Sequence, residues 1–225
     1  QHDILRHTFS QTLRTIIFLI VPATVLLYVL GEATIGVLLE HGAFTERSTQ
    51  LVFFALQFYL IGLLAHSALE IIVRAFYALQ NTLTPVVVGI AAMSLNIGLS
   101  FLLVGSLSFG GLALANSLAT TLEMFLLLWL LSRRLGGIEG RHVLSTLTRS
   151  LAGAAVMWSV LWLWLRWVHD LAPAQLDSDW TAAIGGFVIA VVVYSLVSWL
   201  FRSEELRVLA DMVRIAGERD AVFAG

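Results

Sequence analysis

The amino-acid sequence predicts an all-α integral membrane protein, a bundle of about six transmembrane helices. Hydrophobic residues make up 59% of the 225 residues, and charged residues only 12%. A bilayer core of roughly 30 Å requires about 20 mostly apolar residues for each helical crossing. The chain contains six such stretches, which no soluble domain of this size would carry. They cover about Leu13–Leu30, Leu51–Val73, Pro85–Val104, Gly111–Leu131, Leu151–Val168 and Trp180–Phe201.

The distribution of arginine predicts the orientation of the bundle. All 13 basic residues are arginines, and an excess of Lys and Arg in short loops marks the cytoplasmic side of a membrane protein. If Gln1 starts in the cytoplasm, six crossings leave only Arg47 and Arg166 on the outer side. The opposite orientation would invert this bias almost completely. We therefore expect both ends of the chain to be cytoplasmic.

The first span contains a proline and is followed by a polar loop. Pro22 has no backbone N–H and therefore kinks a helix, which membrane bundles tolerate where a neighbour satisfies the freed carbonyl. The kink is either structural or a bend used in gating, and the sequence leaves both readings open. After the loop, Thr45 is placed to cap a second helix that begins near Glu46.

The second span carries the most polar side chains. His66, Glu70 and Arg74 are spaced four residues apart and therefore share one helix face. Ionisable groups within a bilayer are costly and usually face the bundle interior or water, so they indicate a functional site. The alternative is that Arg74 reaches the inner interface and Glu70 merely pairs with it.

The third and fourth spans carry fewer polar groups. Asn96 and Ser100 are four residues apart in the third span and point the same way. The fourth span contains Asn116 and Glu123. Polar and small residues of this kind often serve only to pack transmembrane helices together, and that reading accounts for most of them.

The last two spans differ from the first four, and they suggest a division of the chain. They are almost free of internal polar groups and rich in tryptophan, including Trp158 and Trp162. We predict that these two tryptophans and the 184–193 face of the last span line a groove for a lipid tail. The expected parts are four helices of a transport lobe (1–137), two additional transmembrane helices that form the groove (138–202), and a cytoplasmic amphipathic tail (203–225) with Ser203 as its N-cap.

The sequence contains no motif of an enzyme. We find no glycine-rich phosphate loop, no His-Glu-x-x-His pair and no nucleophile elbow. The chain has no cysteine, which excludes disulfides and thiolate metal sites. The arginines are explained by membrane topology, so nucleic-acid binding is not indicated. Transport, lipid handling and a scaffold role remain.

Three segments resemble the bacterial lipid II flippase family (MurJ/MviN). They are 41–45 (HGAFT), 74–85 (RAFYALQNTLTP) and 111–117 (GLALANS). The family belongs to the multidrug/oligosaccharidyl-lipid/polysaccharide exporter superfamily, and the resemblance extends over about residues 10–137. It implies that this chain is the C-terminal portion of a longer polytopic transporter, the last six of fourteen helices.

The resemblance implies translocation of undecaprenyl-linked lipid II across the bacterial cytoplasmic (inner) membrane by alternating access, for cell-wall synthesis. The partners would be this polyprenyl-diphosphate-linked glycan lipid and membrane lipids. Arg74, Glu70 and His66 would line the substrate cavity. The alternatives are a flippase for another polyprenyl-linked glycan, such as O-antigen or capsule units, and a membrane scaffold without transport. Buried charge, expected at Glu70, Arg74 and Glu123, favours transport, because a scaffold has no reason to retain such costly groups.

The resemblance implies no organic cofactor, but it suggests coupling to sodium or protons. Some members of the family bind sodium through an asparagine and an acid one turn apart, in the helix that matches the third span. Asn96 matches the asparagine, whereas Ser100 stands where the acid would be, which counts against a sodium site. Asn96, Ser100 and Asn116 are the candidate cation ligands.

Overall fold

The computed structural model describes residues 2–40, 44–171 and 180–200, and these residues are almost entirely helical. Six helical segments in this part of the chain are long and apolar enough to cross a membrane, which confirms the predicted fold class. The last of them consists of a π-helical turn, η1, that continues directly into α7. The elements are α1 (His2–Leu39), α2 (Glu46–Ala78), α3 (Leu83–Leu107), α4 (Phe109–Arg134), α5 (Gly140–Leu171), η1 (Thr181–Gly185) and α7 (Gly186–Leu200).

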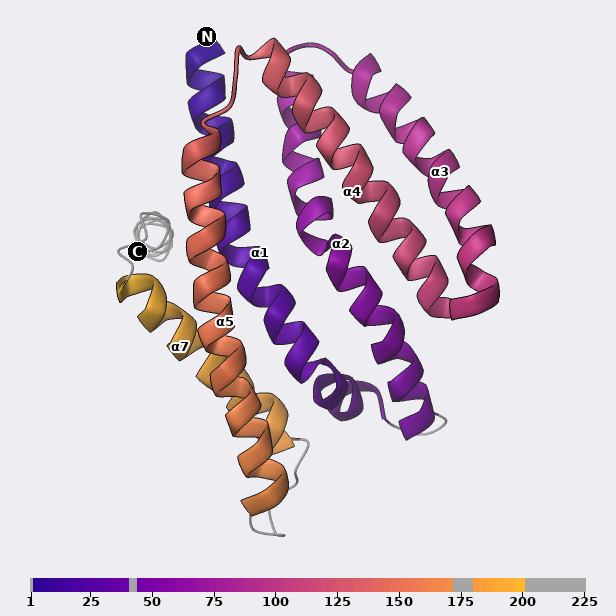
Figure 1. Ribbon diagram of the computed structural model, residues 1–225, viewed down its shortest axis with the longest axis vertical. Helices are drawn as coiled ribbons and strands as arrows, with labels where there is room; N and C mark the ends of the chain where they lie inside the picture. Colours follow the sequence, from indigo (N-terminus) through magenta and orange to yellow (C-terminus); the bar gives the residue numbers. More distant parts are fainter. Residues whose placement is uncertain (1, 41–43, 172–179, 201–225) are drawn as a thin grey trace, which may run out of the picture.

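Successive helices run in alternating directions (Figure 1). The start of α1, the α2–α3 connection and the α4–α5 connection therefore lie at one end of the bundle, which we call the N-terminal end. The arginines of α1, Arg6 and Arg14, lie near this end, as do Arg133 and Arg134 in the last turn of α4. The clustering of arginine at one end matches the sequence analysis, whereas the membrane side that this end faces stays a prediction.

The helices extend well beyond the apolar stretches that predicted them. We expected the first span to end near Leu30, but α1 continues to Leu39. Beyond Leu30 it packs closely on α2, since a Cβ added to Gly31 would lie 2.9 Å from a ring atom of Phe53. Hydropathy marks the part of a helix that crosses the bilayer, whereas packing and caps decide where the helix ends. At the start of α2, Thr45 occupies the N-cap position as predicted.

Two clusters of buried side chains hold the bundle together. The larger joins α1, α2 and α4 near the N-terminal end, and includes the fully buried Ile72, Phe76 and Leu127. The smaller joins α1, α5 and α7 around Met157 and Leu161. Lipid tails are as apolar as these side chains, so close van der Waals packing rather than removal from water stabilises such contacts in a membrane.

The parallel helices α2 and α4 approach closely because small residues lie between them. Most of the buried positions in the first half of α4 are Gly, Ala, Ser or Thr. Opposite them, Gly62 of α2 leaves no room for a side chain, since a Cβ there would lie 2.8 Å from Cα of Ser117. Small residues of this kind allow the backbones of transmembrane helices to come close together.

Helix α3 lies at the edge of the bundle and packs mainly on α4. Its only buried residue is Pro85. The turn between α3 and α4 is a single residue, Ser108, which has a φ of 48°. The apolar stretch that predicted the fourth helix begins at about Gly111, whereas α4 begins at Phe109. Gly111 is needed for the tight turn, because a Cβ there would lie 2.4 Å from the carbonyl oxygen of Leu103.

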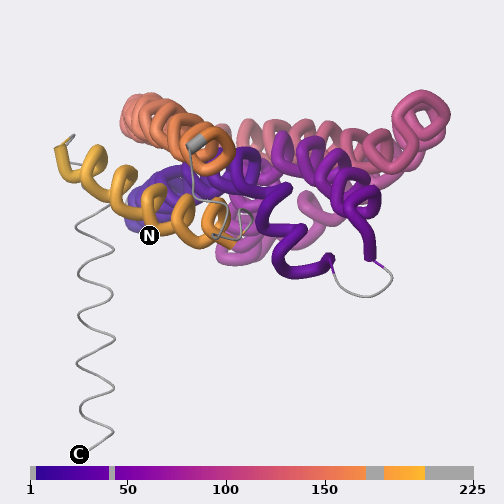
Figure 2. Tube along the Cα trace, turned by 90° about the horizontal axis from the view of Figure 1, so that it is seen from below, coloured from indigo at the N-terminus to yellow at the C-terminus, as the bar shows by residue number. Residues whose placement is uncertain are grey.

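Helix α1 connects two parts of the bundle. Viewed from below, α5 and α7 lie on one side of α1, and α2, α3 and α4 lie toward the other side (Figure 2). The contacts between helices agree with this arrangement, because α1 packs on α2, α5 and α7, whereas α2 and α4 pack on each other. The predicted amphipathic tail at 203–225, with its N-cap Ser203, lies outside the described residues.

Candidate transport site

A polar stripe follows one face of α2 toward the N-terminal end, as the four-residue spacing predicted. His66, Glu70 and Arg74 are all exposed on this face, whereas we expected Glu70 and Arg74 to be buried. Glu70 and Arg74 form a close ion pair, and their side chains are 65% and 72% exposed. Exposed pairs contribute little to stability in water, so stability does not explain their presence in a helix that is otherwise apolar. The open face leaves both side chains accessible to a ligand.

His66 also connects the stripe to α4. The side-chain amide nitrogen of Asn116 lies 3.0 Å from Nε2 of His66. One residue further along α4, the Ser117 hydroxyl donates a 2.7 Å hydrogen bond to the carbonyl oxygen of Phe58. The two contacts hold α2 and α4 in a fixed register. Sequence spacing did not reveal the contact between His66 and Asn116, because 50 residues separate them.

The three candidate cation ligands form two separate contacts. Ser100 donates a 3.3 Å hydrogen bond to Oδ1 of Asn96 within α3, whereas Asn116 contacts His66 instead. Where α3 packs on α4, a Cβ added to Gly89 of α3 would lie 3.3 Å from Oε1 of Glu123 of α4. Gly89 and Asn96 are two turns apart on α3, as are Glu123 and Asn116 on the antiparallel α4. This register places Asn96 and Asn116 at the same level.

The connection between α2 and α3 is attached to the last turn of α4. The side chain of Asn81, just after α2, contacts Thr84 at the start of α3. With its amide oxygen turned toward Arg134, Asn81 accepts hydrogen bonds from both terminal guanidinium nitrogens, at 2.6 and 2.8 Å. This orientation of the amide is assigned from its hydrogen-bond partners. Nearby, the Arg133 guanidinium lies 3.9 Å from the ring centroid of Trp129.

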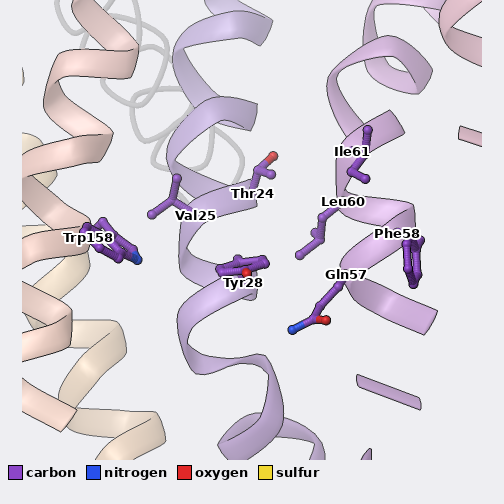
Figure 3. A pocket seen from close by; sticks show the side chains of 8 residues that line it. All are labelled: Thr24, Val25, Tyr28, Gln57, Phe58, Leu60, Ile61 and Trp158. Carbon is purple, nitrogen blue, oxygen red and sulfur yellow. The ribbon is translucent and has the colours of Figure 1, made fainter. Parts of the chain in front are cut away.

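A groove of about 340 Å³ crosses α1 between α2 and α5, and we call it the α1–α2–α5 groove. In Figure 3, Trp158 extends toward α1 from α5, and the Gln57 amide extends toward Tyr28 from α2. The lining combines aromatic rings and aliphatic side chains with one amide and two hydroxyl groups. It consists of Thr24, Val25, Tyr28, Gln57, Phe58, Leu60, Ile61 and Trp158.

A second groove of about 180 Å³ lies between α1, α5 and α7, and we call it the α1–α5–α7 groove. It is apolar except for two hydroxyl groups. Its lining is Pro22, Ala23, Leu26, Met157, Ala190, Val191, Tyr194 and Ser195.

The two tryptophans that we predicted for a lipid-tail groove do not line this second groove. Trp158 belongs to the α1–α2–α5 groove. Trp162 is half exposed, and the guanidinium of Arg166 lies 5.1 Å from its ring centroid. Their assignment to a lipid groove stays a prediction. Of the predicted 184–193 face, Ala190 and Val191 do line the α1–α5–α7 groove. The part that α1 plays in this groove was not predicted, because it depends on how α1 and α7 pack.

Comparisons with known proteins identify the family. A family model described as lipid II flippase MurJ matches residues 1–174. A probable lipid II flippase MurJ of Rhizobium tropici is 32% identical over 194 residues, which cover 85% of this chain and 36% of the relative. A protein of the same description from Buchnera aphidicola subsp. Baizongia pistaciae is 30% identical over 154 residues, covering 68% of this chain and 30% of the relative.

A solved structure agrees in fold. It is described as lipid II flippase MurJ in an inward closed conformation, and it superposes with a TM-score of 0.75 at 24% identity. The match covers 89% of this chain and 40% of the solved chain. The chain spans about a third of the length of the curated relatives. The family match over residues 1–174 and the six apolar helices lead to one conclusion: this chain is a multi-pass membrane protein of the lipid II flippase MurJ family.

Proposed function

We propose that this chain is the C-terminal part of a flippase that moves undecaprenyl-linked lipid II from the inner to the outer leaflet of the bacterial cytoplasmic membrane. It works by alternating access, with both ends of the chain in the cytoplasm. The observation that carries the proposal, beside family membership, is the polar stripe of His66, Glu70 and Arg74 on an apolar transmembrane helix. Intramembrane ionisable residues mark substrate and ion pathways.

Each member of the stripe has a role that suits an anionic headgroup. Arg74 binds the diphosphate, because a guanidinium forms two charge-assisted hydrogen bonds with phosphate oxygens at once. Glu70 holds the guanidinium in place through their ion pair until the substrate arrives. His66, which is held by Asn116, extends the polar path toward the middle of α2. The hydrocarbon tail of the substrate follows the helices α5 and α7, with Trp158 and Trp162 facing lipid.

The coupling ion in this proposal is sodium or a proton. Asn96, Ser100 and Asn116 supply neutral oxygen atoms, the ligand type that hard cations prefer, but no negative charge. The acid two turns from Asn116 on the same face of α4 is Glu123, which is not among the predicted cation ligands.

The experiment is complementation of a flippase-depleted strain with variants of the full-length protein. We expect Arg74→Ala to abolish growth at normal protein level, because the diphosphate loses its cationic partner. Glu70→Gln should cause a milder defect, since the amide still accepts a hydrogen bond from Arg74. Arg47→Ala is the matched control, because Arg47 is an exposed arginine in the first turn of the same helix, and it should support normal growth.

The outcome separates the proposal from the alternatives. Normal growth of both Arg74→Ala and Glu70→Gln at native expression would show that the stripe is structural. Growth without lipid II reaching the outer leaflet, measured by its accessibility to an impermeant lipid II-cleaving enzyme, would indicate a scaffold. If a different polyprenyl-linked glycan, such as an O-antigen or capsule unit, becomes accessible to an impermeant enzyme in the outer leaflet instead, that glycan is the substrate.

A further inference from the structure

The proline within α1 leaves one carbonyl without its normal helical partner. In an α-helix the N–H of each residue bonds to the carbonyl four residues earlier, so the partner of the Phe18 carbonyl would be residue 22. Pro22 has no N–H to donate. No water is available in the bilayer core, and an unsatisfied carbonyl there is costly. Another group must therefore satisfy the Phe18 carbonyl.

Tyr194 of α7 supplies that group. Its hydroxyl donates a 2.7 Å hydrogen bond to the Phe18 carbonyl oxygen, across 176 residues of sequence. The rings of Phe18 and Tyr194 also pack together, with their centroids 5.2 Å apart. On the other side, Gly153 of α5 makes room for the tyrosine, because a Cβ there would lie 3.2 Å from a ring atom of Tyr194. Three helices therefore meet at this one side chain.

The contact lies midway along α1 and close to residues that line both grooves. Figure 1 shows that the lower half of α1 slants away from the line of its upper half. Pro22 lines the α1–α5–α7 groove, and Thr24, two residues later, lines the α1–α2–α5 groove. The Thr24 hydroxyl bonds back to the carbonyl of Ile20 at 2.8 Å, an interaction that favours helix bending.

We propose that Tyr194 is a positioning residue whose hydroxyl acts as a releasable clamp on the bend of α1. While the hydrogen bond to Phe18 is made, α7 fixes the angle between the two halves of α1. When α7 moves, the bond breaks and α1 is free to change its bend. In the proposed flippase, a hydrocarbon tail that enters the α1–α5–α7 groove displaces α7 and so alters α1. This last step rests on the proposed function, whereas the clamp does not.

The clamp is tested first by a double-mutant cycle in the full-length protein. Tyr194→Phe removes only the hydroxyl, and we expect its thermal unfolding midpoint in detergent to fall by a few degrees. Pro22→Ala restores an N–H for the Phe18 carbonyl, so adding Tyr194→Phe to it should cause almost no further change. Equal effects of Tyr194→Phe in both backgrounds would overturn the clamp. Pro22→Leu restores the same N–H and replaces Pro22→Ala if that variant does not accumulate.

A distance measurement tests the bend itself. This chain has no cysteine, so in a cysteine-free full-length protein spin labels can be placed on α1 at Gln11, before the bend, and at the exposed Leu38, after it. We expect Tyr194→Phe to broaden or shift the distance distribution, and Pro22→Ala to remove that effect. Tyr59→Phe, at an exposed tyrosine of α2, is the control and should leave the distribution unchanged. If the distance distribution of Tyr194→Phe is unchanged, the hydroxyl does not control the bend of α1, and the clamp is overturned.

A transport assay separates the clamp from the proposed function. If both hold, Tyr194→Phe should slow lipid II translocation several-fold at normal protein level, whereas Tyr59→Phe should not. A shifted distance distribution with an unchanged translocation rate would support the clamp and overturn its coupling to transport. Absence of lipid II translocation by the unsubstituted protein would overturn the proposed function, and the spin-label result would still decide the clamp.

Discussion

Replacement of Gly62 by alanine tests whether the close contact between α2 and α4 holds the site together. The added Cβ would lie 2.8 Å from Cα of Ser117 and 2.7 Å from its Oγ. Carbon atoms pack best at about 3.5–4.0 Å, so the two helices would have to separate locally by roughly 0.7–1.2 Å. A rotation of the Ser117 side chain cannot relieve the overlap, because the Cα atom belongs to the backbone.

This local separation of the two helices should lower the free energy of unfolding. Overpacking of a well-packed site costs about 1–3 kcal/mol, and loss of the hydrogen bond from Ser117 to Phe58 adds about 1 kcal/mol. Alanine also favours the helix over glycine by about 0.5–1 kcal/mol. Gly98→Ala in α3 is the matched control. It brings the same gain in helix propensity, and its added Cβ would have no atom within 4 Å. The difference between the two variants therefore isolates the cost of packing.

The assay is thermal unfolding of the purified full-length variants in detergent. We expect Gly62→Ala to unfold well below Gly98→Ala, and the added substitution Ser117→Ala should not restore stability, because the backbone overlap remains. The contact between His66 and Asn116 should also weaken, since a shift of this size would lengthen its 3.0 Å distance beyond hydrogen-bonding range. Equal stability of the two glycine variants would refute the reasoning.

Two further predictions concern orientation and the lipid groove. Single cysteines at Ser48 and Ser178 should react with an impermeant thiol reagent from outside the cell, whereas a cysteine at Ser145 should not; labelling at Ser145 alone would contradict the topology. Photo-crosslinkers at Trp158 and Trp162 should capture polyprenyl lipid, because the segment from Leu151 to Leu165 contains no ionisable side chain, which a polar pathway would need. Capture only from α2 would reject the groove.

Spacing along one helix predicted the local parts of the site. The four-residue intervals placed Glu70 beside Arg74 and Asn96 beside Ser100, and the structure contains both contacts. Such predictions succeed because a helix fixes the separation of residues one turn apart, whatever surrounds it.

The spacing of residues along one helix could not predict the contacts between different helices. The pairing of His66 with Asn116 depends on the register of α2 and α4, which is decided by Gly62 and Ser117 at their point of contact. Pro22 predicted that some neighbour must satisfy a carbonyl, but not that the neighbour would be Tyr194. In the same way, the apolar character of α5 predicted contact with lipid without showing that Trp158 faces the groove over α1.

The position of α3 at the edge of the bundle affects how its sequence can vary among relatives. Within the described residues this helix packs mainly on α4, and side chains such as Val87, Ile90 and Phe101 are largely exposed. An outward position surrounded by hydrocarbon must be apolar, but it need not have a particular shape. Substitutions should therefore accumulate freely along this face, with hydropathy kept while identity is lost. The side of Gly89 that receives Glu123 should change far more slowly.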